Sequence, residues 1–550
     1  MTTATQAAGS AHTAQPPPFN LVDEPWIRVL DVHGDTRMLN LEEVFARAHQ
    51  IKRLDGELPT QDFAMLRMLL AIGYRTLNID PDNPLRSWAA LYRAGAFDMG
   101  PIRHYLDRWR HRFDLFDAEA PFLQTPGLRN AHDTWKELHV LVPDSPIKKS
   151  IYVHRDPHEP IGPAEAARWL VHLMSYDTAG NKTPAVGDTR ENPKKTNGPG
   201  WAGAIGGLYF RGDTLFDTLM FNTVATQPVT GDAAWEGPVP APGGSPDPIV
   251  YVGLMGTLVW PRRRVRLNTD VDAAGNTRIT GALVCNGDTF DAGLRQNEET
   301  MSAWRYNEGV SKTKGFEVYY PKLHDPSQAL WRGLGGILPH TRTENETTKS
   351  GFDENVKVAT MKPPAILEFL AELIAAGELD RSARFTLCSI GVQYGPQRAK
   401  IDSIIHDELT FAAMLAETDG PAQAAALTAI TRTTDALKVL RRFDESLNQA
   451  SSGSKSATGT DRRAMDIAHS RIDIEFRTWL ATLTDDNHNR ALADWTAALA
   501  RTIRDIADDL IAAAPPAAWI GRRVPLNGPL RSVGTADKKL REDLPKVLPH

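Results

Sequence analysis

The segment MDIAHSRIDIEFRTWLATL, residues 465–483, decides the architecture of the C-terminal part of this chain. Its apolar side chains recur every three or four residues, which is the spacing of one face of an α-helix. That face carries Met465, Ala468, Ile472, Phe476, Trp479 and Leu483. Residues 427–440 and 492–510 repeat the pattern, and we expect further helices at residues 406–415 and 537–547. Amphipathic helices with polar connectors bury their apolar faces together, so the pattern predicts a four-helix bundle over residues 403–550.

Residues 19–402 differ from the C-terminal part in composition and in the spacing of their apolar residues. Alternating apolar residues predict a strand at residues 19–30 and a second one after a turn at Gly34, and helical spacing follows at residues 41–49, 62–77, 86–92 and 102–113. Residues 114–250 are rich in Gly, Pro, Asn, Asp and Thr, which favours long loops. Strands are expected again at residues 249–260, 263–267 and 278–285. The sequence therefore predicts an α+β protein, with a mixed α/β domain at residues 19–402 before the helical bundle.

Composition limits the classes of function. The chain has 550 residues, and 62 Lys and Arg against 68 Asp and Glu give a net charge of −6, so any phosphate-binding surface has to be a local patch. The two cysteines, Cys285 and Cys388, cannot form a disulfide framework or a Cys-based zinc site. Residues 1–18 carry no Lys, Arg, Asp or Glu and no apolar segment, so we expect a disordered tail instead of a signal peptide. No run of about 18 apolar residues suggests a membrane span, and a cytoplasmic protein is expected.

One stretch matches the residue pattern of a known binding motif but lacks the neighbouring elements that the motif requires. Gly198-Pro-Gly-Trp-Ala-Gly203 has the spacing G-x-G-x-x-G of dinucleotide-binding loops. That function requires an apolar strand before the loop and a helix after it, and neither is predicted here. The glycines indicate either a mobile loop or a backbone that comes very close to another molecule.

His-Asp pairs raise the possibility of metal chemistry. They occur at residues 132–133, 324–325 and 406–407, and such a pair can hold a divalent ion that hydrolyses phosphate esters. The three pairs lie in unlike contexts without a clear set of further ligands. The spacing His154-Arg-Asp156-Pro-His158 lies among prolines, which favours a turn-rich loop over a metal site. An HD-type metal-dependent phosphohydrolase stays an alternative, but we predict no catalytic residue, no metal and no cofactor.

Basic residues with aromatic neighbours recur in the predicted loops. The segment Lys148-Lys-Ser-Ile-Tyr-Val-His-Arg155 joins two lysines, an aromatic ring and an arginine. Further examples are Lys194-Lys195 before the glycines, Arg262-Arg-Arg264 after Trp260, and Gln393–Lys400 around a Gly-Pro turn. Such loops suit phosphate contacts, groove insertion and stacking on bases. For any one of these patches taken alone, an ordinary solvated surface is the favoured interpretation, because charged surface loops are common.

In their order along the chain, several segments resemble one family, the large (CasA) subunit of the type I-E CRISPR surveillance complex. The first is Asn20-Leu-Val-Asp-Glu-Pro-Trp-Ile-Arg-Val29, and the most specific is Pro121-Phe-Leu-Gln-Thr125. The similarity includes residues 39–45 and 62–73, the glycine-rich stretch that ends at 206–212, and residues 394–407. It covers nearly the whole chain from about residue 19.

The resemblance implies a mixed α/β domain, a C-terminal four-helix bundle and a non-catalytic role. Members of this family recognise the protospacer-adjacent motif of double-stranded DNA from the minor groove, help to open the duplex and recruit the helicase-nuclease that degrades it. The implied partners are the other subunits of the complex, the crRNA, the target DNA and that helicase-nuclease. A scaffold protein without nucleic-acid contact is the remaining alternative.

The resemblance also implies three DNA-contacting elements in the domain at residues 19–402. A docking loop with an aromatic residue corresponds to Tyr152, Val153 and His154. A glycine loop corresponds to Gly198, Gly200 and Gly203, with Lys194 and Lys195 before it. A wedge that parts the first base pair corresponds to Gln397, Arg398 and Ala399, with its tip at one of the first two. Because the minor groove has a degenerate pattern of donors and acceptors, few such contacts give permissive recognition.

The family's lysine finger falls in the turn at residues 268–278, where this chain has no lysine. Asn276 or Arg278 is the expected substitute. Some members hold zinc there with cysteines, which are absent from this turn, so no metal is expected.

Overall fold

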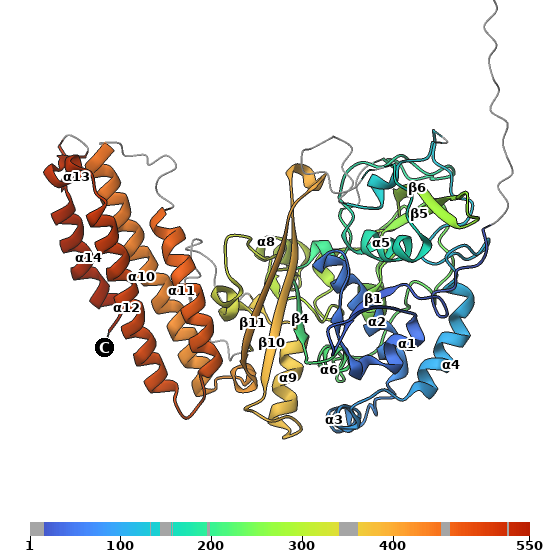
Figure 1. The fold of residues 1–550 in the computed structure, drawn as a ribbon, viewed down its shortest axis with the longest axis horizontal. Helices are drawn as coiled ribbons and strands as arrows, with labels where there is room; N and C mark the ends of the chain where they lie inside the picture. Colours follow the sequence, from blue (N-terminus) through green and yellow to red (C-terminus); the bar gives the residue numbers. More distant parts are fainter. Residues whose placement is uncertain are drawn as a thin grey trace, which may run out of the picture. The chain divides into compact units, whose positions relative to one another are not determined.

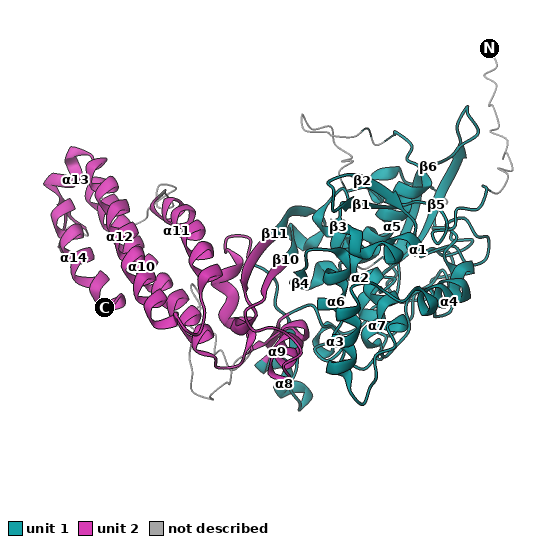
Figure 2. Cartoon of the chain, turned by 60° about the horizontal axis from the view of Figure 1, so that its bottom comes forward, with its two compact units in different colours: residues 1–302, 308–324, 390–406 teal, residues 303–307, 325–389, 407–550 magenta. Residues whose placement is uncertain are grey.

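The computed structural model describes residues 16–132, 134–143, 156, 158–194, 198–339, 361–452, 463–524 and 527–549. The chain forms two compact units, which Figure 2 shows in different colours. Unit 1 comprises residues 1–302, 308–324 and 390–406, and unit 2 comprises residues 303–307, 325–389 and 407–550. The predicted domain boundary at residue 402 stays a prediction, and the tail predicted at residues 1–18 lies almost wholly outside the described residues.

Unit 1 begins with a three-stranded antiparallel sheet in the order β2-β1-β3 (Thr36–Leu39, Ile27–Asp31, Ile51–Leu54). Gly34 has a φ of 92° and supplies the predicted turn between the first two strands. Helix α1 (Leu41–Ala46) begins with a capping box, in which the Asn40 side chain accepts a hydrogen bond from the Glu43 N–H. The other predicted N-terminal helices are confirmed as α2 (Pro59–Thr76), α3 (Pro84–Ala94) and α4 (Met99–Trp109).

Helix α2 lies at the centre of unit 1. It is buried almost all round, because α4, α5 (Pro163–Tyr176), α6 (Leu215–Phe221) and α7 (Gly253–Leu258) pack against it. Even Arg67 on α2 is buried, and its guanidinium donates two hydrogen bonds to Glu299, at 3.0 and 2.6 Å. The same carboxylate accepts a hydrogen bond from Trp201 Nε1 at 2.7 Å. This buried, charge-assisted network ties the segment around Trp201 to the central helix.

The strands predicted at residues 263–267 and 278–285 are confirmed. They form the antiparallel hairpin β5 (Arg263–Val271) and β6 (Thr277–Asn286). The strand predicted at residues 249–260 is wrong, because residues 253–258 form the buried helix α7. A short apolar run fits a buried strand and a buried helix equally well, and only the packing decides between them.

The helix predicted at residues 406–415 is also wrong. Strand β11 (Ile401–Ala412) occupies most of it and pairs with β10 (Arg384–Tyr394), in a sheet ordered β11-β10-β4 with β4 at Gly207–Arg211. The apolar residues in this segment suit the helix spacing, but its β-branched residues pack well in a sheet, and the partner strand supplies the backbone hydrogen bonds. A second small sheet has the order β8-β7-β9 (Tyr319–Pro321, Trp304–Tyr306, Met361–Lys362), and helices α8 and α9 span Glu308–Lys314 and Ala365–Ala375.

Unit 2 carries the long C-terminal helices, which Figure 1 draws side by side in orange and red. They are α10 (Pro421–Ser452), α11 (Arg463–Thr482), α12 (His488–Ala512) and α14 (Val533–Val547), and the helical predictions for residues 427–440, 465–483, 492–510 and 537–547 are confirmed. Short elements join α12 to α14, namely α13 (Pro516–Ile520), β12 (Arg522–Arg523) and β13 (Leu530–Arg531). None of the described helices combines the length and the apolar character needed to cross a membrane.

An aromatic cluster fills the core beneath these helices. The ring of Phe476 stacks on Trp331, with 4.1 Å between ring centroids, and meets Trp495 edge-on at 5.1 Å. Trp331 belongs to a 3₁₀ helix at Leu330–Gly336, and its Nε1 donates a hydrogen bond to Asp473 at 2.8 Å. Residues 330–336 therefore pack with the C-terminal helices, although they are about 70 positions from the start of the predicted bundle.

Candidate nucleic-acid interface

The backbone that follows helix α5, residues 176–179, supports two of the predicted DNA-contacting elements. The N–H of Gly200 donates a hydrogen bond to the carbonyl oxygen of Asp177 at 2.9 Å. The N–H of Ala179 donates one to the carbonyl oxygen of Arg398 at 2.8 Å. The structure therefore brings the predicted glycine loop and the predicted wedge to one short segment, although about 200 residues separate them in the sequence.

The glycines of this loop allow close contacts within the chain. A Cβ atom on Gly200 would lie 2.2 Å from the carbonyl carbon of Ser175, and one on Gly203 would lie 2.0 Å from the hydroxyl oxygen of Tyr394. Both glycines are buried, whereas Gly198 is half-buried and has a φ of 85°. The close approach predicted from the glycines is therefore made to the protein itself at Gly200 and Gly203. Gly198 is the predicted glycine that retains an accessible side.

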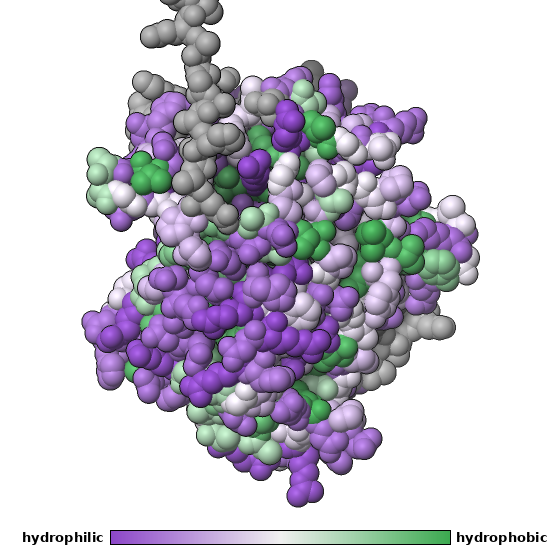
Figure 3. All heavy atoms as spheres, turned by 90° about the vertical axis from the view of Figure 1, so that its right-hand side faces the viewer, coloured by the Kyte–Doolittle hydropathy of each residue, from purple (hydrophilic) through white to green (hydrophobic). Residues whose placement is uncertain are grey.

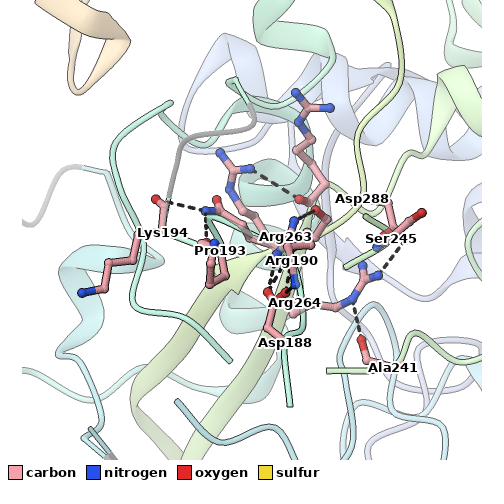
Figure 4. Close-up of polar contacts among 12 residues, drawn as sticks. Asp188, Arg190, Pro193, Lys194, Ala241, Ser245, Arg263, Arg264 and Asp288 are labelled. Carbon is pink, nitrogen blue, oxygen red and sulfur yellow. Dashed lines mark hydrogen bonds and ion pairs between the residues drawn. The ribbon is translucent and has the colours of Figure 1, made fainter. Parts of the chain in front are cut away.

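Lys194 lies at the exposed start of this loop. Arg190 fixes the preceding residues, because its guanidinium donates a hydrogen bond to Asp188 at 2.9 Å and one each to the carbonyl oxygens of Asn286 and Gly287, both at 3.0 Å. Figure 4 shows the Lys194 side chain pointing away from this polar cluster. The backbone of Lys194 is contacted by the Asn286 side chain, whose amide donates to the Lys194 carbonyl oxygen at 3.5 Å, while the Lys194 side chain is exposed. Lys195 lies outside the described residues.

The run Arg262–Arg264 lies in the interior of unit 1, so neither a phosphate-contacting loop nor a solvated surface describes Arg263 and Arg264. Arg263 pairs with Asp177 and donates to the carbonyl oxygen of Gly198 at 2.9 Å, and Arg264 pairs with Asp288 at 2.6 Å. Burial acts to raise the pKa of Asp177, but the cationic groups of Arg263 and Lys182 outweigh it and hold that pKa below its ordinary value. The Asp177 carboxylate is therefore ionised at neutral pH.

The predicted wedge is the turn between β10 and β11. The N–H of Gly395 donates to the carbonyl oxygen of Lys400 at 2.9 Å and closes the turn. Gln397 and Arg398 both have a φ of 55°, a left-handed conformation that costs a non-glycine residue about 1–2 kcal/mol. Their side chains and that of Ala399 are exposed. The turn therefore projects two long polar side chains from a strained backbone, as expected from the Gly-Pro sequence.

A cavity of about 500 Å³ lies beside this turn. It reaches from the end of α5 to residues 399–401, and Lys136, Lys182 and Lys400 are among the residues that line it. The buried hydroxyl of Tyr176, which also lines it, has no hydrogen-bond partner among the residues that the structure describes. Lys182 and Lys400 are paired with Asp177 and Asp402, at 2.9 and 2.7 Å, and Asp177 also lines the cavity, so its walls carry charges of both signs.

The turn between β5 and β6 contains the predicted substitutes for the lysine finger. Asp272 accepts hydrogen bonds from the backbone N–H and the side chain of Asn276, at 2.9 and 3.3 Å, and from Arg278 Nε at 2.8 Å. These bonds lower the pKa of Asp272 to about 2. Both candidate side chains are therefore held by one carboxylate, with Arg278 partly exposed beside it.

The remaining site predictions have mixed outcomes. The docking-loop residues Tyr152, Val153 and His154 lie outside the described residues. Of the His-Asp pairs, His324 contacts the Gly207 carbonyl oxygen at 2.9 Å, and Asp407 forms an ion pair with Arg477 at 2.9 Å. Within the described ranges, no group of three or more His, Cys, Asp or Glu side chains could hold a metal ion.

One face of the molecule, drawn in Figure 3, is mostly hydrophilic. Apolar side chains gather there only in small, separate patches. Scattered apolar side chains of this kind are normal on a protein surface and need no partner to cover them.

The sequence comparison agrees with this arrangement of elements. The family model described as CRISPR-associated protein Cse1 matches residues 20–506. The chain belongs to this family. A curated relative, the CRISPR-associated protein CasA/Cse1 of Thermus thermophilus, is 32% identical over 275 residues, which are 48% of this chain and 51% of that protein. The alignment with this relative therefore spans about half of its length.

Solved structures extend the similarity over the whole fold. The crystal structure of Thermobifida fusca Cse1 is 32% identical, has a TM-score of 0.83 and aligns over 97% of this chain and 98% of that one. A chain in a structure described as a CRISPR RNA-guided surveillance complex is 18% identical, with a TM-score of 0.68 over 96% of this chain and 100% of that one. At that identity, the second likeness indicates the fold alone.

Proposed function

We propose that this chain is the subunit of a type I-E CRISPR RNA-guided surveillance complex that recognises the protospacer-adjacent motif and begins to open the duplex. One observation carries the proposal, namely that the glycine loop and the exposed wedge turn are both hydrogen-bonded to residues 176–179. A groove reader and a strand separator have to act on neighbouring base pairs, so a common rigid support suits the two tasks.

In this proposal the motif is read by few and permissive contacts. Gly198 and Lys194 face the minor groove, and Arg278 or Asn276 at the β5–β6 turn adds a second contact. Because the minor groove distinguishes mainly A·T from G·C pairs, backbone and short polar contacts give tolerance for related motifs. The rest of the sequence is read by pairing between crRNA and target strand.

Opening is assigned to the turn at residues 396–399. Parting the first base pair costs a few kcal/mol of stacking and pairing, which an inserted side chain and phosphate contacts can offset. The Gln397 amide or the Arg398 guanidinium enters beneath the motif, and the strained backbone is held by the bond from Ala179 to Arg398. Neither step requires a catalytic group, so the proposed role is non-enzymatic.

The proposed partners are the other subunits of the complex, the crRNA, the target DNA and the helicase-nuclease that the complex recruits. Docking onto the complex is assigned to Tyr152, Val153 and His154, by the family resemblance. The near-neutral chain, with a net charge of −6, suits a subunit that holds DNA firmly only when the rest of the complex adds charge and avidity.

The test is an electrophoretic binding assay with complex reconstituted with and without this chain. The duplex carries a sequence matched to the guide and either a functional motif or a scrambled one. We expect binding and opening of the matched duplex to require both the chain and the functional motif. Equal binding to both duplexes by an assembled complex would indicate the scaffold alternative. Divalent-dependent DNA turnover that is lost in His406→Ala would indicate the phosphohydrolase.

A further inference from the structure

One cation beneath the glycine loop, Arg262, has no counter-charge among the residues that the structure describes. Arg263 and Arg264 pair with Asp177 and Asp288, but Arg262, the first residue of the run, makes no ion pair or side-chain hydrogen bond with any residue in the described ranges. Its side chain lies in a residue that is only 9% exposed, and its Nε is buried without a partner. A buried guanidinium in this state is unusual, because burying a charge is unfavourable unless the charge is paired.

The surroundings of Arg262 do not neutralise it. The ring of Phe290 lies 6.0 Å from its guanidinium carbon, at the limit of a cation–π contact. Burial and the neighbouring Arg263 lower the pKa of Arg262 to about 9, which leaves it protonated at neutral pH. The carboxylate of Asp177, which pairs with the adjacent Arg263, is also shared by Lys182. This corner of unit 1 therefore carries an excess of positive charge.

The position of Arg262 connects that charge to the glycine loop. A Cβ atom on Gly198 would lie 2.8 Å from Arg262 Nη2, so the glycine leaves the space that the guanidinium occupies. Gly198 also has a φ of 85°, which a residue with a side chain adopts only with strain. Position 198 therefore requires glycine for two reasons, namely its positive φ and the space that the Arg262 guanidinium takes up.

We propose that Arg262 binds a backbone phosphate of the DNA that lies over Gly198. A phosphodiester carries the single negative charge that the site lacks, and its oxygens match the planar fork of a guanidinium. This inference rests on the proposed function, and it adds a sequence-independent anchor to the motif contacts. A phosphate contact positions the duplex without reading its sequence.

The test compares Arg262→Met and Arg262→Lys in the full chain, within the reconstituted complex. Duplex binding is measured at several salt concentrations, with functional and scrambled motifs. We expect Arg262→Met to weaken binding several-fold on both duplexes and to reduce the slope of log K against log salt by about 1, because one fewer phosphate is neutralised. Arg262→Lys should retain that slope. The control Arg541→Met, on helix α14, should leave binding and slope unchanged.

Thermal unfolding of the free chain separates this role from a structural one. Removing an uncompensated buried cation should leave the Tm unchanged or raise it. A variant that fails to fold, or whose Tm falls by many degrees, would overturn the proposal, as would an unchanged salt slope in Arg262→Met. If the wild-type complex ignores the motif while the slope still falls, the phosphate anchor stands and the proposed motif reading fails.

Discussion

The hydroxyl of Tyr394 donates a hydrogen bond of 2.8 Å to the carbonyl oxygen of Tyr176. Tyr394 is the last residue of β10, directly before the wedge turn, and Tyr176 is the last residue of α5. Gly203 packs against the same hydroxyl, and burial raises the pKa of Tyr394 well above its ordinary value, so it stays a donor. The phenol of Tyr394 thus contacts the end of α5 and the glycine loop at the base of the wedge turn.

Gly200→Ala should destabilise unit 1. The added Cβ meets the backbone of Ser175 at 2.2 Å, and backbone cannot rotate away as a side chain can. Overpacking of this kind costs about 1–3 kcal/mol. The measurement is chemical denaturation of the full chain. The control is Gly237→Ala, where nothing lies within 4 Å of the new atom. Equal stability of the two variants would refute the tight contact.

The double change Gln397→Ala and Arg398→Ala should slow strand opening without loss of stability, because both side chains are exposed. A target with mismatched pairs beside the motif should restore the rate, since the unpairing cost is removed in advance. Stopped-flow fluorescence of a base analogue beside the motif measures the rate. The matched control, Arg47→Ala with Gln50→Ala, removes an exposed arginine and glutamine from elsewhere in unit 1. The wedge assignment is wrong if the double variant opens matched duplex at the wild-type rate.

His172 should make stability depend on pH. Burial lowers its pKa to about 4 from the ordinary 6.5, so the unfolded chain takes up a proton that the folded chain refuses. The contribution is present above pH 6.5 and is lost as the pH falls to about 4, by about 3 kcal/mol in total. In His172→Gln this contribution is absent, so the free energy of unfolding should change less with pH over this range than it does in the wild type. The exposed His33→Gln serves as the control, and curves for His172→Gln and wild type that stay parallel would contradict the assignment.

Trp331→Ala should loosen the C-terminal helices. Truncating a buried aromatic residue costs about 3–5 kcal/mol, and here it uncovers Phe476 and removes the hydrogen bond from Trp331 to Asp473, which then keeps only its bond from Arg477 among those described. Hydrogen exchange should rise in α11 and α12 while unit 1 stays protected. Trp519→Ala is the matched control, because Trp519 is 56% exposed. Unchanged exchange in α11 would mean that residues 330–336 do not support the helices.

The sequence predicted the parts of the fold that repeat locally. Apolar spacing located α2, α11 and α12, because each helix buries one continuous face or more. It failed at β11, where pairing with β10 overrides a helix-like pattern, and at α7, where a short apolar run fits both states. Both errors arise because the deciding partner is distant in the chain.

The candidate site was predictable only in outline. From the glycines we predicted either a mobile loop or a close approach to another molecule, whereas the close contacts at Gly200 and Gly203 are made to Ser175 and Tyr394 of the same chain. The bond between Arg263 and Asp177 joins residues 86 positions apart, so a surface arginine and an interior one look alike in the sequence. Arg263 and Arg264, the first two residues of a predicted strand, were the available signal, because successive residues of a strand point to opposite faces and one of the two had to point inward.

The glycine loop is held by Ser175 on one side and by the bond from Trp201 to Glu299 on the other. A loop held in this way cannot change its conformation to fit the DNA. In the proposed complex the double helix has to bend and widen instead, so targets whose base steps yield easily gain an advantage at positions that no side chain touches. Flexibility of the DNA, and not of the protein, then becomes part of what is selected.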